Sequence, residues 1–230
     1  MKIMTSAKVH PAKVLRAARK TSRRQDYSSS TKRALLDNAQ ELFAAHGYSG
    51  TSLDEVVAAA RVTKGALYHH FPSKLALFES VFDRLQDSTT RQIQKRIDAS
   101  DDPWERAQIG LESFLEVCRE PHFRRICLQE APAALGHERW AEAERASSLG
   151  IVRATVDDLL DDLGGAAELS EAFAMIFYGA IRSASEYVSD SDDGEQASAD
   201  VQASIGAILA GMRLLPSIDG AEVTSADVSA

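Results

Sequence analysis

Cysteine, aromatic residues and long apolar runs are all scarce in this chain of 230 residues. Its two cysteines, Cys118 and Cys127, stand in a part of the chain rich in alanine and leucine. They are therefore expected as small buried side chains rather than as a disulfide or a redox sensor. No run of about 18 apolar residues occurs, which excludes a membrane-spanning helix. Together these absences predict a soluble, cytoplasmic protein.

Motifs of the common enzyme classes are missing as well. The sequence contains no glycine-rich phosphate loop, no nucleophile elbow and no pair of carboxylates at a catalytic spacing. His69 and His70 are adjacent, so their side chains diverge on a helix, and no cysteine or carboxylate stands at metal-ligand spacing from them. Neither an enzymatic activity nor a metal or other cofactor is expected.

The net charge of −8 is unevenly distributed along the chain. Residues 1–78 hold 13 Lys and Arg against 5 Asp and Glu, whereas residues 79–230 hold the other 13 basic residues against 29 acidic ones. An acidic surface that served solubility alone would not account for basic residues gathered in the first third. The pattern predicts an N-terminal part that binds phosphate and an acidic remainder that is repelled by it.

Two short helices joined by a tight turn are predicted within residues 51–71. Ser52 and Glu55 have the spacing of a capping box at the start of the first helix. One face of that helix carries apolar side chains at helical spacing, namely Leu53, Val56, Val57 and Ala60. Arg61 and Val62 form the turn, and Thr63 suits the N-cap of the second helix.

The second helix leaves most of its surface to a partner. Leu67 and Phe71 are its large apolar side chains that point the same way, and Pro72 ends it, because the residue before a proline avoids the helical region. Lys64, Tyr68 and His69 lie outside that apolar pair. In a helix-turn-helix, a second helix of this kind enters the DNA major groove while the first crosses the backbone.

Apolar stripes on both sides complete a three-helix domain over residues 30–88. The upstream stripe is Leu35, Leu36, Ala39, Leu42 and Phe43, and Gly47 follows at the position of a C-terminal glycine cap. Downstream, Ser73 caps a helix whose apolar residues are Leu75, Phe78, Val81, Phe82 and Leu85.

The run ALLDNAQELFAAHGYSGTSLDEVVAAARVTKGALYHHFPSKLALFESVF resembles the N-terminal domain of TetR-type transcriptional repressors over its whole length. The matching elements are A-x-x-L-F-x-x-x-G-Y-x-x-T-S, a small-residue turn, T-K-G-x-L-Y-x-H-F and S-K-x-x-L-F. In that family the rest of the chain is usually a helical domain that dimerises and binds a small molecule. The resemblance thus implies an all-α protein with a helical regulatory and dimerisation domain at 89–215, followed by a flexible tail at 216–230.

Hydroxyl and ammonium groups are expected to contact DNA phosphates, because they position a protein without distinguishing bases. These are the side chains of Thr51, Thr63, Tyr68 and Lys74. Backbone N–H groups at the helix starts near Ser52 and Thr63 also favour phosphate. Gly65 and Ala66 allow close approach, and Ala66 can touch a thymine methyl group.

Lys64 and His69 are expected to contact base edges, with Lys64 suited to guanine acceptors. His70 is expected to orient the helix inside the domain rather than to contact DNA.

Residues 1–29 form a basic arm with two open interpretations. Eight Lys and Arg precede Asp26, the first acidic residue, and Ser28, Ser29 and Ser30 are expected to act as a hinge. A flexible or partly helical arm of this kind can enter the minor groove or follow phosphates. Alternatively, it is a solubilising tail.

From residue 73 onward the sequence predicts helices at 73–96, 101–121, 123–130, 137–163, 170–188 and 196–215. The last two combine large apolar residues with many small ones, and the resemblance implies that they form a four-helix dimer interface; packing within one chain is the alternative. One recognition helix contacts too few base pairs to select a site in a genome. We therefore expect a homodimer that binds double-stranded DNA at a palindromic operator.

A ligand cavity between the C-terminal helices would be mostly apolar with a few polar groups. Candidate lining residues are Phe114, Cys118, Phe123, Trp140, Met175, Phe177 and Tyr178, with Arg182 as a polar anchor; each could instead belong to the ordinary core. An unidentified small-molecule effector is expected to favour a conformation in which the two DNA-binding domains no longer match the operator.

The predicted function is thus a sequence-specific transcriptional regulator, a repressor released by its ligand. Two alternatives remain at this point. One is a ligand-independent architectural DNA binder that uses the basic arm, and the other is a helical enzyme or interaction protein that retains the domain.

Overall fold

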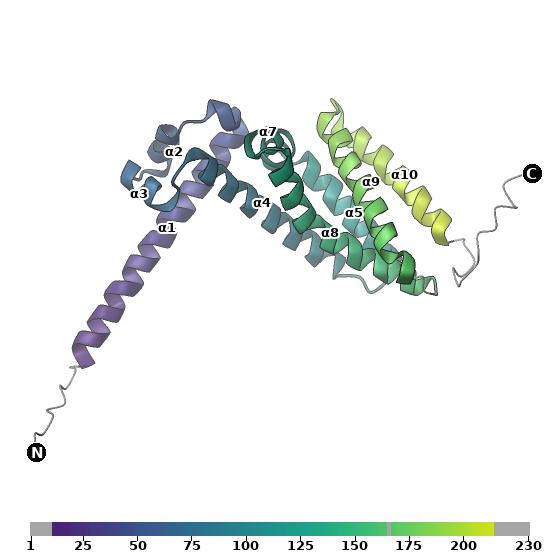
Figure 1. Cartoon of the computed structure of the whole chain (residues 1–230), viewed down its shortest axis with the longest axis horizontal. Coiled ribbons are helices and arrows are strands. Elements are labelled where there is room, and N and C mark those ends of the chain that lie inside the picture. The colour runs from purple at the N-terminus through teal and green to yellow at the C-terminus, as the bar shows by residue number, and fades with distance from the viewer. Residues whose placement is uncertain (1–10, 165–166, 214–230) are drawn as a thin grey trace, which may run out of the picture.

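The computed structural model describes the backbone of residues 11–164 and 167–213, and the side chains of residues 27–164 and 168–213. Every regular element in this part is helical, which confirms the all-α prediction (Figure 1). The elements are α1 (Pro11–Gly50), α2 (Leu53–Ala60), α3 (Lys64–His70), α4 (Lys74–Ile97), α5 (Pro103–Arg119), α6 (Pro121–Phe123), η1 (Arg124–Glu130), α7 (Ala131–Leu135), α8 (His137–Asp162), η2 (Ala167–Leu169), α9 (Ser170–Asp190) and α10 (Gly194–Arg213).

In the N-terminal domain, α1, α2, α3 and the start of α4 pack around one core. Its fully buried side chains come from the predicted stripes and include Leu35, Ala39, Phe43, Val56, Leu67 and Phe78. The turn between α2 and α3 depends on Arg61, which adopts the left-handed conformation with φ 54° and ends α2. Gly47, with φ 72° and ψ 174°, interrupts the helical geometry near the end of α1 as a glycine cap does.

The predicted hinge at Ser28, Ser29 and Ser30 is wrong, because α1 continues through all three residues. The hydroxyls of Ser30 and Thr31 both donate to the carbonyl of Tyr27 at 2.9 Å, one turn back along the same helix. Serine and threonine can remain inside a helix when their hydroxyls bond to the preceding turn in this way. The side chains of the basic arm up to residue 26 and the C-terminal tail lie outside the described residues.

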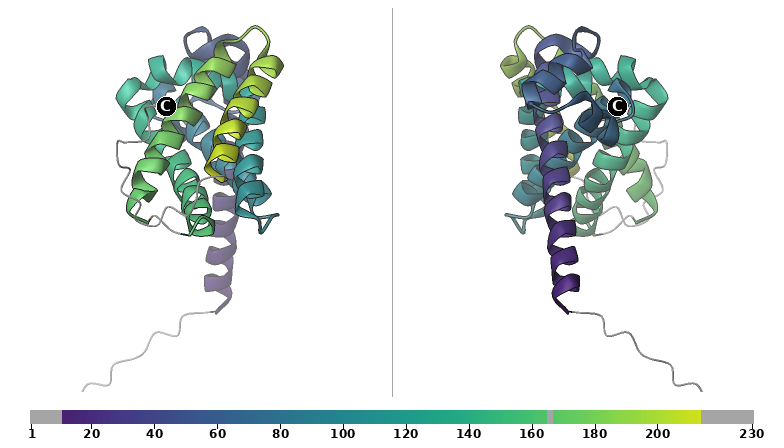
Figure 2. Two further views of the ribbon diagram at one scale, coloured as in Figure 1. Left: turned by 90° about the vertical axis from the view of Figure 1, so that its right-hand side faces the viewer. Right: turned by 90° about the vertical axis from the view of Figure 1, so that its left-hand side faces the viewer.

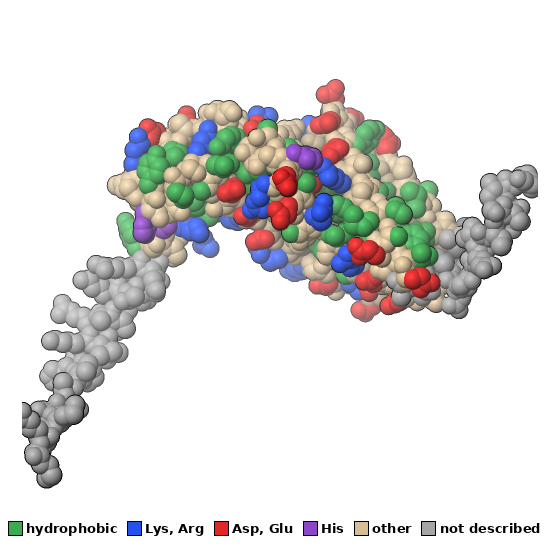
Figure 3. Space-filling view, viewed as in Figure 1, with side chains coloured by type: hydrophobic (Ala, Val, Ile, Leu, Met, Phe, Trp, Pro, Cys, Tyr) green, Lys and Arg blue, Asp and Glu red, His purple; other side chains and the backbone are tan. Residues whose placement is uncertain are grey.

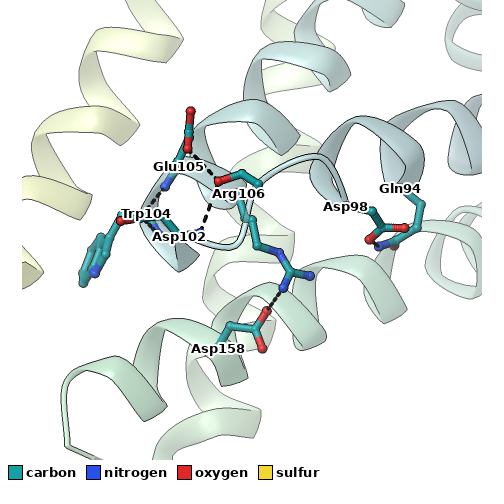
Figure 4. Close-up of polar contacts among 8 residues, drawn as sticks. Gln94, Asp98, Asp102, Trp104, Glu105, Arg106 and Asp158 are labelled. Carbon is teal, nitrogen blue, oxygen red and sulfur yellow. Dashed lines mark hydrogen bonds and ion pairs between the residues drawn. The ribbon is translucent and has the colours of Figure 1, made fainter.

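In the C-terminal domain, the second half of α4 packs with α5, α8, α9 and α10. The predicted boundaries of these helices are confirmed to within a few residues. Asp102 caps α5 by accepting hydrogen bonds from the backbone N–H groups of Trp104 and Glu105 at 2.9 Å (Figure 4). Arg106, one turn into α5, pairs with Asp158 of α8 at 3.1 Å. The cap thus fixes where α5 starts, and the ion pair ties it to α8.

The segment between α5 and α8 differs from the prediction of a single helix at 123–130 that Pro132 would stop. It consists of the short α6, the π-helix η1 and then α7, with Pro132 inside the first turn of α7. A proline fits there because the first residues of a helix have no N–H partner within it. Pro132 therefore begins a helix instead of ending one.

Cys118 and Cys127 are buried free thiols, as expected for small apolar side chains. Burial raises the pKa of Cys118 to about 12, and burial raises that of Cys127 as well. Within the described residues no helix is long and apolar enough to cross a membrane.

The two domains lie side by side along the molecule, and α4 runs from one into the other (Figure 1). The α9 and α10 helices form the end of the C-terminal domain that lies away from α2 and α3 (Figure 2). The pair α2 and α3 and the pair α9 and α10 therefore lie at opposite ends of the molecule.

Candidate nucleic-acid interface

Helix α3 is anchored by one side and exposed on the other. Thr63 caps it by accepting a hydrogen bond from the N–H of Ala66 at 3.2 Å. Leu67 is fully buried and Phe71 is 2% exposed, so these two residues fix the helix on the domain. The outward surface comprises Thr63, Lys64, Gly65, Tyr68 and His69, with Ala66 half-buried beside them. Tyr68, at 53% exposure, is a large aromatic side chain with no core function.

The N-terminus of α2 lies beside this surface. Ser52 and Glu55 form the predicted capping box: the Ser52 hydroxyl accepts from the N–H of Glu55 at 3.2 Å, and the Glu55 carboxylate accepts from the N–H of Ser52 at 2.7 Å. The Ser52 hydroxyl also donates to the Glu55 carboxylate at 2.7 Å, and this hydrogen bond, followed by that from the Ser52 N–H, lowers the pKa of Glu55. Ser52 is exposed, so its position is compatible with the predicted phosphate contact.

Thr51 does not have the environment predicted for it. The residue is 2% exposed, and its hydroxyl donates to the carbonyls of Gly47 and Leu42 at 2.9 and 3.1 Å. Because the hydroxyl is directed into the domain, it cannot also contact a phosphate outside. Thr51 instead fixes the connection between α1 and α2.

Lys64 is exposed at the first turn of α3 and pairs with Asp54 of α2 at 2.8 Å. The hydrogen bond to Asp54, together with the charge of that carboxylate, raises the pKa of the Lys64 ammonium. The pair joins the two helices of the motif at the surface where DNA is expected. Lys64 would have to exchange Asp54 for a base edge on binding.

His70 faces the domain more than its neighbour does. It is half-buried, and its ring lies 5.2 Å from that of His69 and 6.2 Å from that of Phe71. Burial lowers the pKa of His70, and the charges of His69 and Lys32 act in the same direction. His69 remains exposed. Within the described residues, His, Cys, Asp and Glu do not gather into a group that could hold a metal ion.

Lys74, at the start of α4, is held at the edge of the same surface. Its ammonium lies 4.5 Å from the centre of the Tyr48 ring and donates to the carbonyl of Ser49 at 3.4 Å. The remaining N–H groups of the ammonium are available to a phosphate. Contact of Lys74 with DNA, like that of the α3 side chains, stays a prediction.

A cavity of about 100 Å³ lies between α4, α5, α6, α8, α9 and α10. Of the eight predicted ligand residues, Phe114, Phe123 and Phe177 line it. The other five do not. Cys118 and Tyr178 are buried between helices, and Met175 is exposed. The indole N–H of Trp140 donates to the carbonyl of Cys127 at 3.0 Å, and the Arg182 guanidinium stacks on the Trp140 ring.

The polar side chains that line this cavity were not predicted from the sequence. They are uncharged side chains from α4 and α8, namely Gln86, Thr89, Thr90, Ser147, Ser148 and Thr155. A pattern that could have indicated them is present in the sequence, as hydroxyl residues within otherwise apolar helical faces. None of the described residues that line the cavity is charged.

The geometry defines a helix-turn-helix DNA-binding regulator with a separate helical domain. Family comparisons agree with it over both domains. Residues 35–81 match the model described as bacterial regulatory proteins, tetR family, and residues 104–212 match the one described as tetracyclin repressor-like, C-terminal domain. The chain belongs to the TetR family.

Individual relatives show how far the similarity extends. The TetC protein of transposon Tn10 from Escherichia coli is 30% identical over 141 residues, which is 60% of this chain and 70% of that protein. The transcriptional regulator AcrR of Shigella flexneri is 42% identical over 66 residues, or 29% of each chain. A TetR-family regulator from Pectobacterium atrosepticum has a solved structure that superposes with a TM-score of 0.71 at 28% identity, covering 83% of this chain and 98% of that one.

Proposed function

We propose that this protein binds a palindromic operator as a homodimer and represses transcription until a small uncharged effector releases it. The observation that carries this proposal is the surface of α3, where Lys64, Tyr68 and His69 are exposed on a helix fixed by Leu67 and Phe71. A helix held in this way can enter a major groove without unfolding its own core.

Dimerisation is supported by apolar side chains left exposed on α9 and α10. Ile176 is 66% exposed, and Tyr187 and Ile208 are each 55% exposed. Small residues surround them, including Gly179, Ser183, Ala207 and Gly211, which would allow close approach of a second pair of helices. Apolar side chains gather on this part of the molecule, whereas acidic ones are scattered over the C-terminal domain (Figure 3). An exposed apolar face of this kind is typical of a protein–protein interface.

The cavity supports a neutral effector. Its described lining combines apolar side chains with hydroxyl and amide groups, and an ionised ligand would find no countercharge there. Its volume of about 100 Å³ is below the ~300–1,000 Å³ of most ligand sites, so an effector of drug size has to widen it. Widening would move the surrounding helices, including α4, which continues into the N-terminal domain.

Selection from a pool of random DNA duplexes at near-physiological salt tests the proposal. We expect an enriched inverted repeat and at least a roughly tenfold loss of affinity for it in the Tyr68→Phe, Lys64→Ala double variant, since base and phosphate contacts are lost together. Lys95→Ala, an exposed lysine in the last turn of α4, is the matched control and should bind as the unmodified chain does.

The same experiment separates the alternatives. Binding without an enriched motif that survives the double variant but is lost on removal of residues 1–26 would indicate an architectural DNA binder. Absence of any DNA binding would contradict the regulator proposal altogether. A selected operator then becomes the assay for effectors, with release expected from neutral compounds and not from their charged analogues.

A further inference from the structure

Glu130, the last residue of the π-helix η1, joins the two domains through its carboxylate. One oxygen accepts a hydrogen bond from the backbone N–H of Tyr48 at 3.0 Å, and the other pairs with the guanidinium of Arg125 at 2.9 Å. The Glu130 side chain is 22% exposed, so both interactions are partly shielded from water. Neither Glu130 nor Arg125 was among the residues predicted for DNA binding.

The place that this pair contacts is where α1 loses its helical geometry. Gly47 has φ 72° and ψ 174°, and α1 has no Lys or Arg of its own in its last turn. A Cβ atom on Gly47 would lie 2.5 Å from the Glu130 carboxylate and 2.9 Å from the Arg125 guanidinium. The pair therefore packs directly on the glycine, and Arg125 brings a cation to a helix end that favours one.

Tyr48 in turn holds Lys74. The Tyr48 ring packs edge-on against Phe78, with ring centres 5.0 Å apart, and carries the Lys74 ammonium on its face at 4.5 Å. The adjacent residue, Ser49, supplies the carbonyl that accepts from Lys74. The backbone that Glu130 fixes is thus the backbone that sets where the Lys74 charge lies.

At its other end, η1 begins next to the cavity. Phe123 immediately precedes η1, lines the cavity and is also part of the core that continues into the N-terminal domain. Glu130 is at the opposite end of the same seven residues. π-Helical turns are rare and are often found at functional sites, and this one lies between the cavity and the α1 turn.

We propose that Glu130 is a positioning residue for DNA binding, which holds the Lys74 ammonium at a phosphate by fixing the backbone of Tyr48. The proposal rests on the DNA-binding function proposed above. Only a carboxylate offers acceptors on both sides, to Tyr48 and to Arg125. An amide would have to turn its NH₂ group toward one of these two donors.

The test is the salt dependence of operator binding by the full chain and by Glu130→Gln, Lys74→Ala and the double variant. Each phosphate contact contributes about 0.9 to the slope of log K against log salt, so losing one contact in each protomer of the homodimer lowers the slope by about 1.8. We expect this reduction in each single variant and no further reduction in the double variant. A residue that only stabilised the fold would lower affinity without removing the contribution of one specific phosphate.

Two controls define the result. Glu41→Gln breaks another link between the domains, the 3.1 Å pair of Glu41 with His122, and should keep the original slope. Thr63→Ala removes a separate predicted phosphate contact that carries no charge, so it should lower affinity additively with Glu130→Gln while leaving the salt slope unchanged. If Glu130→Gln unfolds under assay conditions, Glu130→Asp keeps the charge but shortens the reach to Tyr48, and should give the same reduced slope.

An unchanged slope in Glu130→Gln, or a loss that adds fully to that of Lys74→Ala, would overturn the positioning role. Failure of the unmodified chain to select any DNA is a different outcome, because it contradicts the proposed function before Glu130 is tested.

Discussion

Two neighbouring hydroxyl residues at the start of α2 have opposite orientations. Ser52 faces outward in the capping box, whereas Thr51 is buried and donates to two carbonyls at the end of α1. Gly47 supplies one of those carbonyls and also receives the Glu130–Arg125 pair on its α carbon. The connection between α1 and α2 therefore depends on the carbonyl and the missing side chain of Gly47 and on the hydroxyl of Thr51.

Replacing Gly47 with alanine is expected to lower the free energy of unfolding by about 2 kcal/mol, because its backbone conformation is essentially restricted to glycine. The added Cβ would also collide with Glu130. Urea unfolding monitored by circular dichroism measures the change. Gly150→Ala, in the interior of α8 with nothing within 4 Å of its Cβ, should instead stabilise the protein by up to about 1 kcal/mol. Equal effects of the two substitutions would contradict this account.

The outward face of α3 could be predicted from the sequence, whereas the environment of Thr51 could not. Leu67 and Phe71 are four residues apart, and this spacing alone determines which side chains of a short helix remain exposed. Adjacent Thr51 and Ser52 are both suitable caps, and only their surroundings decide which hydroxyl turns inward. Those surroundings come from α1, through carbonyls whose positions follow from the irregular backbone at Gly47.

At the level of elements, the half-buried carboxyl group of Glu144 lies where α8 packs on α9. Burial raises the pKa of Glu144 from 4.5 to about 7; the charge of Arg182 on α9 opposes this shift, and that of Glu186 adds to it. Because the folded chain holds this proton more tightly than the unfolded chain, protonation stabilises the fold. That stabilisation is lost as the pH rises from about 4.5 to 7.

Glu144→Gln should remove this dependence. The unfolding free energy of the variant minus that of the unmodified chain should increase by on the order of 2 kcal/mol between about pH 5 and pH 8. Chemical denaturation at the two pH values provides the measurement. The exposed Glu142→Gln on the same helix is the control, and its difference from the unmodified chain should be nearly independent of pH. A Glu144→Gln difference equally flat with pH would show that the carboxyl group does not titrate in this range.

Long helices were predictable because their caps and apolar spacing are local, as Asp102 and Pro103 show for α5. The π-helix was not, since its wider turn reflects how residues 124–130 fit between α1 and the C-terminal helices. Most of the residues that line the cavity could not be predicted from the sequence either. Its described lining comes from six helices, α4, α5, α6, α8, α9 and α10, so spacing within one helix cannot show which of their side chains meet.

On the scale of the whole molecule, the two proposed interfaces lie at opposite ends. The α3 surface lies on the N-terminal domain, and the exposed apolar face of α9 and α10 lies at the far end of the C-terminal domain (Figure 1). A two-fold axis through α9 and α10 would therefore leave both α3 helices free to contact DNA. It would also place the acidic domain between them, where it is kept from phosphate by repulsion.

Dimerisation through this face predicts a specific effect of charge. Ile176→Glu combined with Ile208→Glu places like charges in the proposed interface, where pairing would bury them without partners. We expect sedimentation velocity to show a monomer with an intact helical spectrum. The salt slope of its operator binding should be about half that of the unmodified chain, because one domain neutralises half the phosphates. Leu169→Glu, at an exposed leucine in η2, tests whether any added acid has this effect and should remain dimeric. A dimeric Ile176→Glu, Ile208→Glu variant would place the interface elsewhere, and the spacing of the two α3 helices would then have to follow from a different axis.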